Sequence, residues 1–224
     1  MRTIAISDIH GFSSTFRSLI DRVGLLKDDQ LIILGDCIDR GPDSKGVLDI
    51  IIKLQTDGYK VNYIMGNHEE MLLKAHYSPS QSDHWFLNGG DVTLKSFGVK
   101  QAKDIPPKYI SFFESLDYEY QTSNAIFVHA GLNMLNENPF QDEYSKLWIF
   151  NWYDQINFNW LKHRKIIHGH VFRSQYEIEK SLENIDEFPV MSIDNGCFVN
   201  KSGFGQLCAL DLTNRKLYFN RNIG

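Results

Sequence analysis

The sequence is poor in cysteine and has no long apolar run. Its three cysteines, Cys37, Cys197 and Cys208, stand far apart and form no Cys-x-x-Cys pair. This usage is typical of reduced thiols in an intracellular protein and argues against a disulfide framework. No apolar stretch is long enough to cross a bilayer, and the apolar segment after Met1 is too short for a signal peptide. We therefore expect a soluble cytoplasmic protein without a membrane partner.

The chain also lacks an excess of basic residues. It carries 23 Lys and Arg against 28 Asp and Glu, a net charge of -5, so we expect no general basic face and no nucleic-acid partner. With 42% hydrophobic and 23% charged residues, the composition excludes a disordered or fibrous chain. The length favours a single domain over residues 1–224. It leaves the oligomeric state undetermined.

What the chain does contain is a repeated unit of strand, polar loop and helix. Short apolar runs predict buried strands, and helical periodicity follows each of the first three. The predicted strands are 3–6, 31–34, 61–64, 125–128, 165–167 and 190–193, with a closing hairpin of 207–212 and 216–219; the predicted helices are 13–23, 44 to about 58, and one from about 69. This order predicts an α/β fold of the α+β four-layer type, a central β-sandwich of two mixed sheets flanked by helices.

Residues 77–122 interrupt the repeat. The segment has turn signals at 88–90 and 106–107, and apolar anchors that include Trp85 and Leu94. We interpret it as a mainly helical insertion that flanks the site and is not an independent domain.

Polar side chains follow the predicted strands at the point where each strand ends. They are Asp8, His10, Asp36, Asp39, Arg40, Asn67, His68, His129, His168 and His170. Loops that follow parallel strands meet at one edge of a sheet, so these side chains are expected to converge. Such a cluster is costly to bury unless a cation lies in it. The sequence therefore predicts a pair of divalent metal ions.

The ligand types indicate the chemistry. Carboxylate, imidazole and amide ligands without thiolate suit Mn²⁺, Fe or Zn²⁺ better than Mg²⁺. With Asp8 and Asp36 as the only anionic ligands, two divalent ions and a bridging hydroxide keep a positive surplus that attracts phosphate. Paired metals also activate the shared water as the attacking hydroxide. Arg40 offers a fork for phosphate oxygens, and His68, held by Asp39, can protonate the leaving alkoxide.

These loops carry five blocks that resemble, in order, the signature of the phosphoprotein phosphatase branch of the metallophosphoesterases. The blocks are Asp8-x-His10-Gly11, Gly35-Asp36-x-x-Asp39-Arg40-Gly41, Gly66-Asn67-His68-Glu69, Val128-His129-Ala130-Gly131 and Gly169-His170. Two further segments, Trp85 to Gly90 and Ile193 to Cys197, are similar to segments of small bacterial serine/threonine phosphatases. The resemblance covers roughly Ile4 to Leu212.

The resemblance implies a β-sandwich and a binuclear site that is usually supported by Mn²⁺. By motif position, the first metal would be held by Asp8, His10 and Asp36, and the second by Asp36, Asn67, His129 and His170. His68 would be the general acid, Asp39 its partner and Arg40 the phosphate clamp, with Asn67 also near the substrate. His168 is the alternative to His170, which we favour because it follows Gly169 as the motif requires. Glu69 is interpreted as a first-turn helix acid.

The pattern departs from the family in two places. Met65 stands where many members have a phosphate-binding arginine, and Phe150 stands in the place of a second one. Phosphate binding would then depend on Arg40, with Arg164 or Arg173 as candidate substitutes. We expect a permissive enzyme with modest affinity for phosphate itself.

Three functions remain to be separated. The first is a phosphatase that hydrolyses phosphoserine and phosphothreonine, and also phosphotyrosine, in proteins. Small phosphoesters would be alternative substrates of the same enzyme. The second is a symmetrical diadenosine tetraphosphate hydrolase, and the third is a regulatory module that binds phosphate without turnover. A cysteine phosphatase is excluded, because Cys-x5-Arg requires an arginine six residues beyond a cysteine and Asp43, Gly203 and Asn214 stand there instead.

Overall fold

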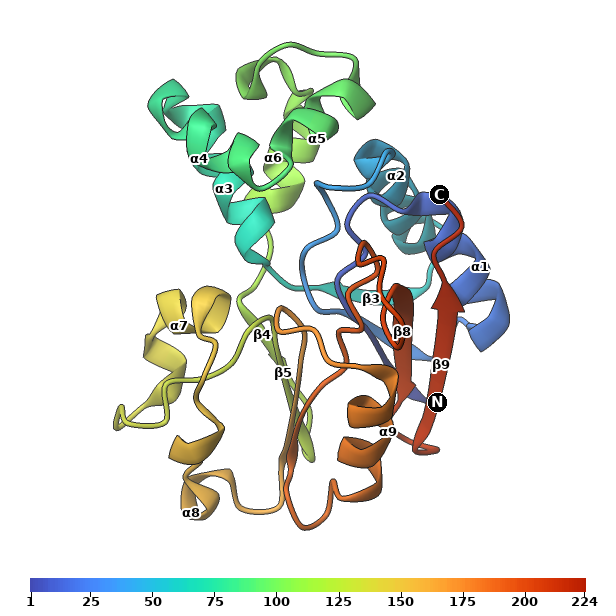
Figure 1. Cartoon of the computed structure of the whole chain (residues 1–224), viewed down its shortest axis with the longest axis vertical. Helices are drawn as coiled ribbons and strands as arrows, with labels where there is room; N and C mark the ends of the chain where they lie inside the picture. Colours follow the sequence, from blue (N-terminus) through green and yellow to red (C-terminus); the bar gives the residue numbers. More distant parts are fainter.

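Two mixed β-sheets form the centre of the molecule in the computed structural model, which describes residues 1–224 (Figure 1). The strands are β1 Thr3–Ile6, β2 Gln30–Ile33, β3 Lys60–Tyr63, β4 Glu119–Gln121, β5 Ala125–Val128, β6 Lys165–His168, β7 Val190–Ser192, β8 Gln206–Asp211 and β9 Lys216–Arg221. The helices are α1 Ser13–Val23, α2 Ser44–Thr56, α3 Asn67–Tyr77, α4 Ser82–Leu87, α5 Gly90–Phe97, α6 Pro107–Glu114, α7 Glu143–Trp148, α8 Phe158–Leu161 and α9 Gln175–Glu183.

The first sheet has the order β3-β2-β1-β8-β9 and the second the order β4-β5-β6-β7. In the first sheet β1, β2 and β3 are parallel, while β8 and β9 are antiparallel to their neighbours. In the second sheet β5, β6 and β7 are parallel and β4 is antiparallel to β5. The parallel strands of each sheet thus end at one edge, where ligand-binding loops can gather.

Alternation along the strands places the two sheets face to face. Ile4 and Ile6 of β1 point toward the helices, whereas Ala5 between them joins a buried cluster that contains residues of both sheets. In the second sheet Phe127 faces the same shared cluster and Ile126 faces the opposite side. Successive side chains of a strand point to opposite faces, so each strand serves two cores. The result is a sandwich with helices outside, as the sequence predicted.

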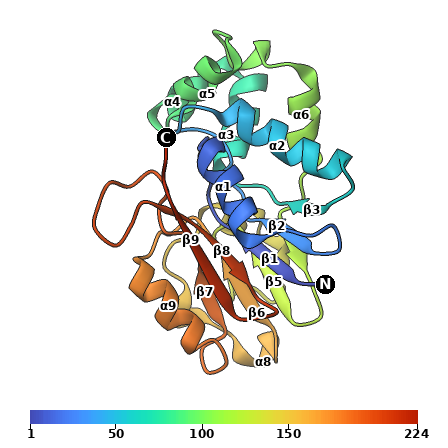
Figure 2. The same cartoon turned by 90° about the vertical axis from the view of Figure 1, so that its right-hand side faces the viewer.

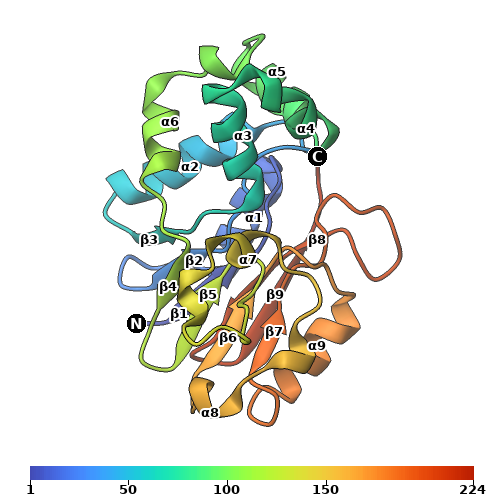
Figure 3. The ribbon, with the colours of Figure 1, turned by 90° about the vertical axis from the view of Figure 1, so that its left-hand side faces the viewer.

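The helices are distributed unevenly around the sandwich. Helices α1 and α2 pack with the first sheet, and α9 contacts β7 of the second. Helices α3 to α6 gather at one end of the molecule in all three ribbon views (Figures 1, 2 and 3), and α5 packs on α2. No helix is long and apolar enough to span a membrane.

The predicted elements are confirmed, with shifts at their ends. Helix α1 has the predicted bounds, whereas β2, β3 and β8 each begin one residue earlier than predicted. Helix α3 begins at Asn67, two residues earlier than expected. Residues 77–122 hold three α-helices, α4 to α6, and also the edge strand β4. Whether they form an insertion in a single domain stays a prediction.

Candidate active site

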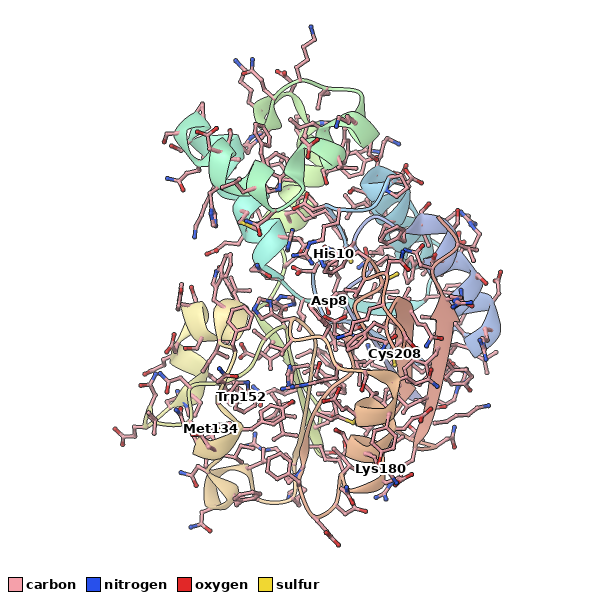
Figure 4. The ribbon with its side chains drawn as sticks, in the orientation of Figure 1. Asp8, His10, Met134, Trp152, Lys180 and Cys208 are labelled. Carbon is pink, nitrogen blue, oxygen red and sulfur yellow. The ribbon has the colours of Figure 1, made fainter.

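The polar side chains that follow the parallel strands of both sheets lie close together. Asp8 and His10 follow β1, Asp36 follows β2, and Asn67 opens α3 after β3. Figure 4 shows Asp8 and His10 near the middle of the molecule, between the α3–α6 end and the sheets. From the second sheet, the loops after β5 and β6 bring His129 and His170 to the same place. The sandwich therefore assembles the site from two sheets.

The backbone of these loops is strained. Only seven residues other than glycine have a positive φ, and five of them are candidate site residues: His10 (49°), Asp36 (50°), Asp39 (70°), Arg40 (66°) and His170 (64°). Each such residue in the left-handed region costs free energy and persists only when its surroundings hold it there. Strain of this kind concentrates at functional sites.

Asp36 lies between two groups of imidazoles. Its Oδ2 is 3.8 Å from Nε2 of His10 and of His68, and its Oδ1 is 3.5 Å from Nε2 of His129. Two triads with ligand atoms close enough to hold an ion therefore share this carboxylate: His10, Asp36 and His68, and Asp36, His129 and His170. A carboxylate with one oxygen toward each group has the geometry of a bridge between two ions.

Backbone carbonyls orient two of the imidazoles. His10 Nδ1 donates to the Ile38 carbonyl at 3.0 Å, and His129 Nδ1 donates to the Leu34 carbonyl at 2.7 Å. The Nε2 atom of each ring is then an unprotonated acceptor that faces the cluster. Burial, and for His10 the charge of Arg40, lowers the pKa of both rings, to about 4 for His129. Neutral imidazoles with inward lone pairs are suitable metal ligands.

Asp8 and His170 join the two sheets at the site. The Asp8 carboxylate accepts the His170 backbone N–H at 3.0 Å, and it lies outside both triads. Burial, with the charges of Asp194 and Asp36, raises the pKa of Asp8 well above its usual value. The His170 ring faces His129, with Nδ1 3.2 Å from His129 Nε2, and its buried Nε2 has no hydrogen-bond partner.

The Asn67 amide lies at the centre of the second triad. Its Oδ1 is 2.9 Å from His129 Nε2. With the amide turned over, its nitrogen is 3.2 Å from Asp36 Oδ2 and 3.2 Å from His170 Nδ1. One terminal atom of Asn67 therefore reaches all three members of the triad.

His68 differs from the other imidazoles of the site. Its Nδ1 is 2.6 Å from Asp39 Oδ2, and both side chains are buried. Burial disfavours the charged ring, but the Asp36 charge and the Asp39 hydrogen bond outweigh burial, so the pKa of His68 is raised. The proton on Nδ1 points to Asp39, and Nε2 points toward Asp36.

Arg40 is the exposed cation of the site. Its guanidinium lies 4.1 Å from the Phe198 ring centroid, and Nη1 donates to His10 Nε2 at 2.7 Å. Met65, at one position where an arginine was absent, is buried. Phe150, at the other, is exposed and packs against the His170 ring with centroids 4.5 Å apart.

The two candidate substitutes for the missing arginines lie in different places. Arg164 precedes β6, at the opposite end of that strand from His170, and donates to the Trp160 carbonyl. The Arg173 guanidinium lies 5.9 Å from the Tyr153 ring.

Sequence reasoning missed what Glu69 does. Its buried carboxylate accepts the backbone N–H groups of Asp36 at 2.9 Å, Cys37 at 2.9 Å and Gly66 at 3.1 Å. The interpretation as a first-turn acid was correct about its position but left out this link between two site loops. A glutamate three residues after a helix cap predicts the Gly66 contact. The contacts with residues 36 and 37 required the tertiary structure.

His168, the alternative to His170, points away from the cluster. Its Nε2 is 2.6 Å from the Tyr153 hydroxyl and its Nδ1 is 2.9 Å from the Gly169 carbonyl. Neither triad contains it. The structure therefore places His170, and not His168, beside His129.

The donor set fits divalent cations. It combines buried carboxylates, neutral imidazoles with inward lone pairs and an amide, and it leaves a buried Nε2 of His170 without a partner. Burying these groups together is costly unless positive charge compensates them. Nitrogen and oxygen donors of this mix suit Mn²⁺, Fe and Zn²⁺.

Comparison with known proteins identifies the class to which this fold and site belong. Residues 1–189 match the family of calcineurin-like phosphoesterases, and the chain belongs to this family. Its members use divalent metals, for which the two triads offer ligands.

Individual relatives carry two different names. The chain is 41% identical over 87 residues, 38% of each chain, to serine/threonine-protein phosphatase 1 of Salmonella typhimurium. It is 46% identical over 69 residues, 30% of this chain and 24% of the relative, to the symmetrical bis(5'-nucleosyl)-tetraphosphatase of Wigglesworthia glossinidia brevipalpis. The chain thus spans well under half the length of these two relatives.

Solved structures support the fold. A candidate diadenosine tetraphosphatase superposes on the whole of this chain and 95% of its own, with a TM-score of 0.69 and 20% identity.

Proposed function

We propose that this protein is a metal-dependent phosphatase that hydrolyses phosphomonoesters, chiefly phosphoserine and phosphothreonine and also phosphotyrosine. Its partners would be phosphorylated proteins or small phosphoesters, without nucleic acid or membrane. The observation that carries the proposal is the position of the Asp36 carboxylate between two pairs of imidazoles, with which it forms the two triads, and the His68–Asp39 pair beside it. A cytoplasmic location stays a prediction.

Two divalent ions, in our proposal Mn²⁺, would be held by Asp8, His10 and Asp36 on one side and by Asp36, Asn67, His129 and His170 on the other. When bound, the ions supply positive charge for the phosphate and an activated water for in-line attack. If His10 Nε2 binds an ion it can no longer accept from Arg40, which frees the guanidinium to bind phosphate oxygens in a bidentate manner.

His68 would act as the general acid. Its raised pKa favours the imidazolium, which donates protons and does not bind metal. Because Asp39 accepts the Nδ1 proton, the proton available to the leaving alkoxide is the one on Nε2. The two nitrogens of one ring thus have separate tasks, one to orient and one to react.

A second candidate is symmetrical cleavage of diadenosine tetraphosphate. The Wigglesworthia relative is named as a symmetrical bis(5'-nucleosyl)-tetraphosphatase, and the same metal and histidine chemistry would act on a phosphoanhydride. The segment from Trp85 to Gly90, which resembles small bacterial protein phosphatases, favours the first candidate.

The test is to compare turnover of a phosphoserine peptide with turnover of diadenosine tetraphosphate, with Mn²⁺ present and metal content measured on the same sample. We expect faster turnover of the peptide. Faster cleavage of the dinucleotide would establish the second candidate. Any Mn²⁺-dependent release from p-nitrophenyl phosphate would eliminate a non-catalytic phosphate-binding module.

A further inference from the structure

The carboxylate that holds His68 is itself held by the α4–α5 segment. Trp85 Nε1 donates to Asp39 Oδ2 at 2.9 Å, and Thr93 Oγ1 donates to Asp39 Oδ1 at 2.6 Å. Asp39 Oδ2 is the same atom that accepts from His68 Nδ1. Asp39, Trp85 and Thr93 are each 0% exposed. Each carboxylate oxygen is thus fixed by a donor that comes from outside the sheets and their loops.

The α4–α5 segment also packs closely against the backbone of Asp39 and Arg40. Asp39 and Arg40 both have left-handed φ angles, and Thr93 Oγ1 also accepts the Asp39 backbone N–H at 2.9 Å. Gly89 approaches so closely that an added Cβ would lie 2.8 Å from the Arg40 nitrogen. Gly90 likewise leaves no room for a side chain next to the Trp85 ring. Glycine is therefore needed at both positions, because a side chain at 89 would keep the α4–α5 segment away from Arg40 and one at 90 would clash with the Trp85 ring.

We propose that Trp85 and Thr93 are positioning residues for proton transfer to the leaving group, acting on His68 through Asp39. The inference rests on the proposed function of His68 as the acid. A carboxylate that loses one donor can rotate about its own side-chain bonds, and its hydrogen bond to His68 then loses its fixed direction. The α4–α5 segment thereby contributes to catalysis without touching the substrate.

The experiment compares two leaving groups. A serine alkoxide must be protonated as it leaves, whereas p-nitrophenolate is stable as an anion. Thr93→Val keeps the shape of Thr93 but removes the hydroxyl. We expect it to lower kcat on a phosphoserine peptide about tenfold, part of the roughly 10²–10⁴-fold that a general acid contributes. We expect KM for the peptide and kcat on p-nitrophenyl phosphate to stay within about twofold, since the acid is not needed there.

Two matched variants control for packing. Thr93→Ser keeps the hydroxyl and should retain the wild-type ratio of the two kcat values. Ser96→Ala removes another hydrogen bond of α5, the one that Ser96 Oγ accepts from the Lys45 backbone N–H at 2.9 Å, and should leave both substrates unaffected. Metal content and melting temperature are measured for every variant. If Thr93→Val does not fold, Trp85→Phe, which replaces the buried indole by a smaller phenyl ring and so removes the N–H donor to Asp39, takes its place.

The possible failures are distinguishable. An equal fall in kcat on both substrates, with Thr93→Ser impaired as much as Thr93→Val, would show that Trp85 and Thr93 only stabilise the fold. That result would overturn the inference. If the wild type cleaves p-nitrophenyl phosphate but no phosphopeptide, the proposed substrate class is wrong, and the variants are compared on an alkyl phosphate instead. The ¹⁵N imidazole resonances of His68, recorded with diamagnetic Zn²⁺ in place of Mn²⁺, give a readout without turnover. Thr93→Val should shift them and Ser96→Ala should not, and an unchanged spectrum in Thr93→Val would contradict the inference.

Discussion

The site has two sides that are held in place differently. The first side consists of the loops after β1, β2 and β3, and the second side consists of the loops after β5 and β6, which carry His129 and His170. On the first-sheet side the loops brace one another, because the Glu69 carboxylate of one loop accepts the Asp36 and Cys37 N–H groups of another. On the second-sheet side the imidazoles depend on the opposite sheet. His129 donates to the Leu34 carbonyl after β2, and the His170 N–H donates to Asp8 after β1. The first half of the site can be organised within one sheet, whereas the second exists only when the sheets are packed together.

The electrostatics of the two sides differ as well. Burial lowers the pKa of His129 and His170 to about 4, so both rings are neutral near pH 7 and available to a metal. On the first side the Asp36 charge and the Asp39 hydrogen bond raise the pKa of His68 despite its burial. In our proposal the same residue type would serve as ligand where its Nδ1 binds a backbone carbonyl, as in His129, and as acid where its Nδ1 binds a carboxylate, as in His68.

Asp36→Asn would affect both sides of the site, because this carboxylate belongs to both triads. We expect loss of metal and of activity together, by at least about 10³-fold in kcat/KM, since the charge shared by the two triads is removed. Metal analysis and turnover on the same preparation provide the measurement. A variant that kept two equivalents of metal would show that Asp36 does not bridge.

His68→Asn would affect only the first side. We expect kcat on a phosphoserine peptide to fall roughly 10²–10³-fold with metal content near wild type, because a general acid is lost and the proposed ligands are not. Asp39→Asn should act in the same direction. Full kcat in His68→Asn would refute the general-acid assignment, and loss of metal would make His68 a ligand.

His168→Gln would test how the second side is buried. The pKa of His168 is lowered by burial from 6.5 to about 3. As pH falls below 6.5, the unfolded chain therefore binds a proton that the folded protein does not, and stability is lost down to about pH 3. At about 1.4 kcal/mol per pH unit, this costs the wild type about 3 kcal/mol between pH 7 and pH 4.5. Urea unfolding at pH 7 and pH 4.5 should show that the free energy of unfolding falls by about 3 kcal/mol less in His168→Gln than in the wild type. An equal fall in the free energy of unfolding in variant and wild type would contradict the lowered pKa of His168.

Phe150→Arg would supply the second side with the phosphate-binding charge that only the first side has in Arg40. Phe150 is 55% exposed and packs on the His170 ring, so an arginine there can reach solvent and the site. We expect inhibition by inorganic phosphate to become about fivefold tighter, as a charge-assisted hydrogen bond at a partly exposed position allows. The inhibition constants of wild type and variant are compared at one ionic strength. No change would mean that position 150 lies out of reach of the phosphate.

Much of the site could be predicted because strand ends are visible in the sequence. Short apolar runs show where a strand stops, and parallel strands stop at a common edge, so the sequence predicts that Asp8, Asp36 and Asn67 lie together. The ends of the predicted strands 125–128 and 165–167, together with the order of the blocks, predict the same location for His129 and His170. Their roles as metal ligands remain a proposal.

Contacts between distant segments could not be predicted. The choice between His168 and His170 depends on a left-handed backbone at position 170 and on the Tyr153 hydroxyl that binds His168. The hydrogen bonds from Trp85 and Thr93 to Asp39 join residues 46 and 54 positions apart. The local hydrophobic periodicity of the sequence cannot predict such contacts.

The amino-acid order alone therefore determined which side chains stand at the ends of the strands, because hydrophobic periodicity is a local property of the chain. The folded protein alone shows that His170 and not His168 faces the cluster, that the Asp36 carboxylate is shared by both triads, and that α4 and α5 hold Asp39. Those outcomes depend on how the two sheets and helices α3 to α6 pack, and packing is set by contacts between residues far apart in the chain.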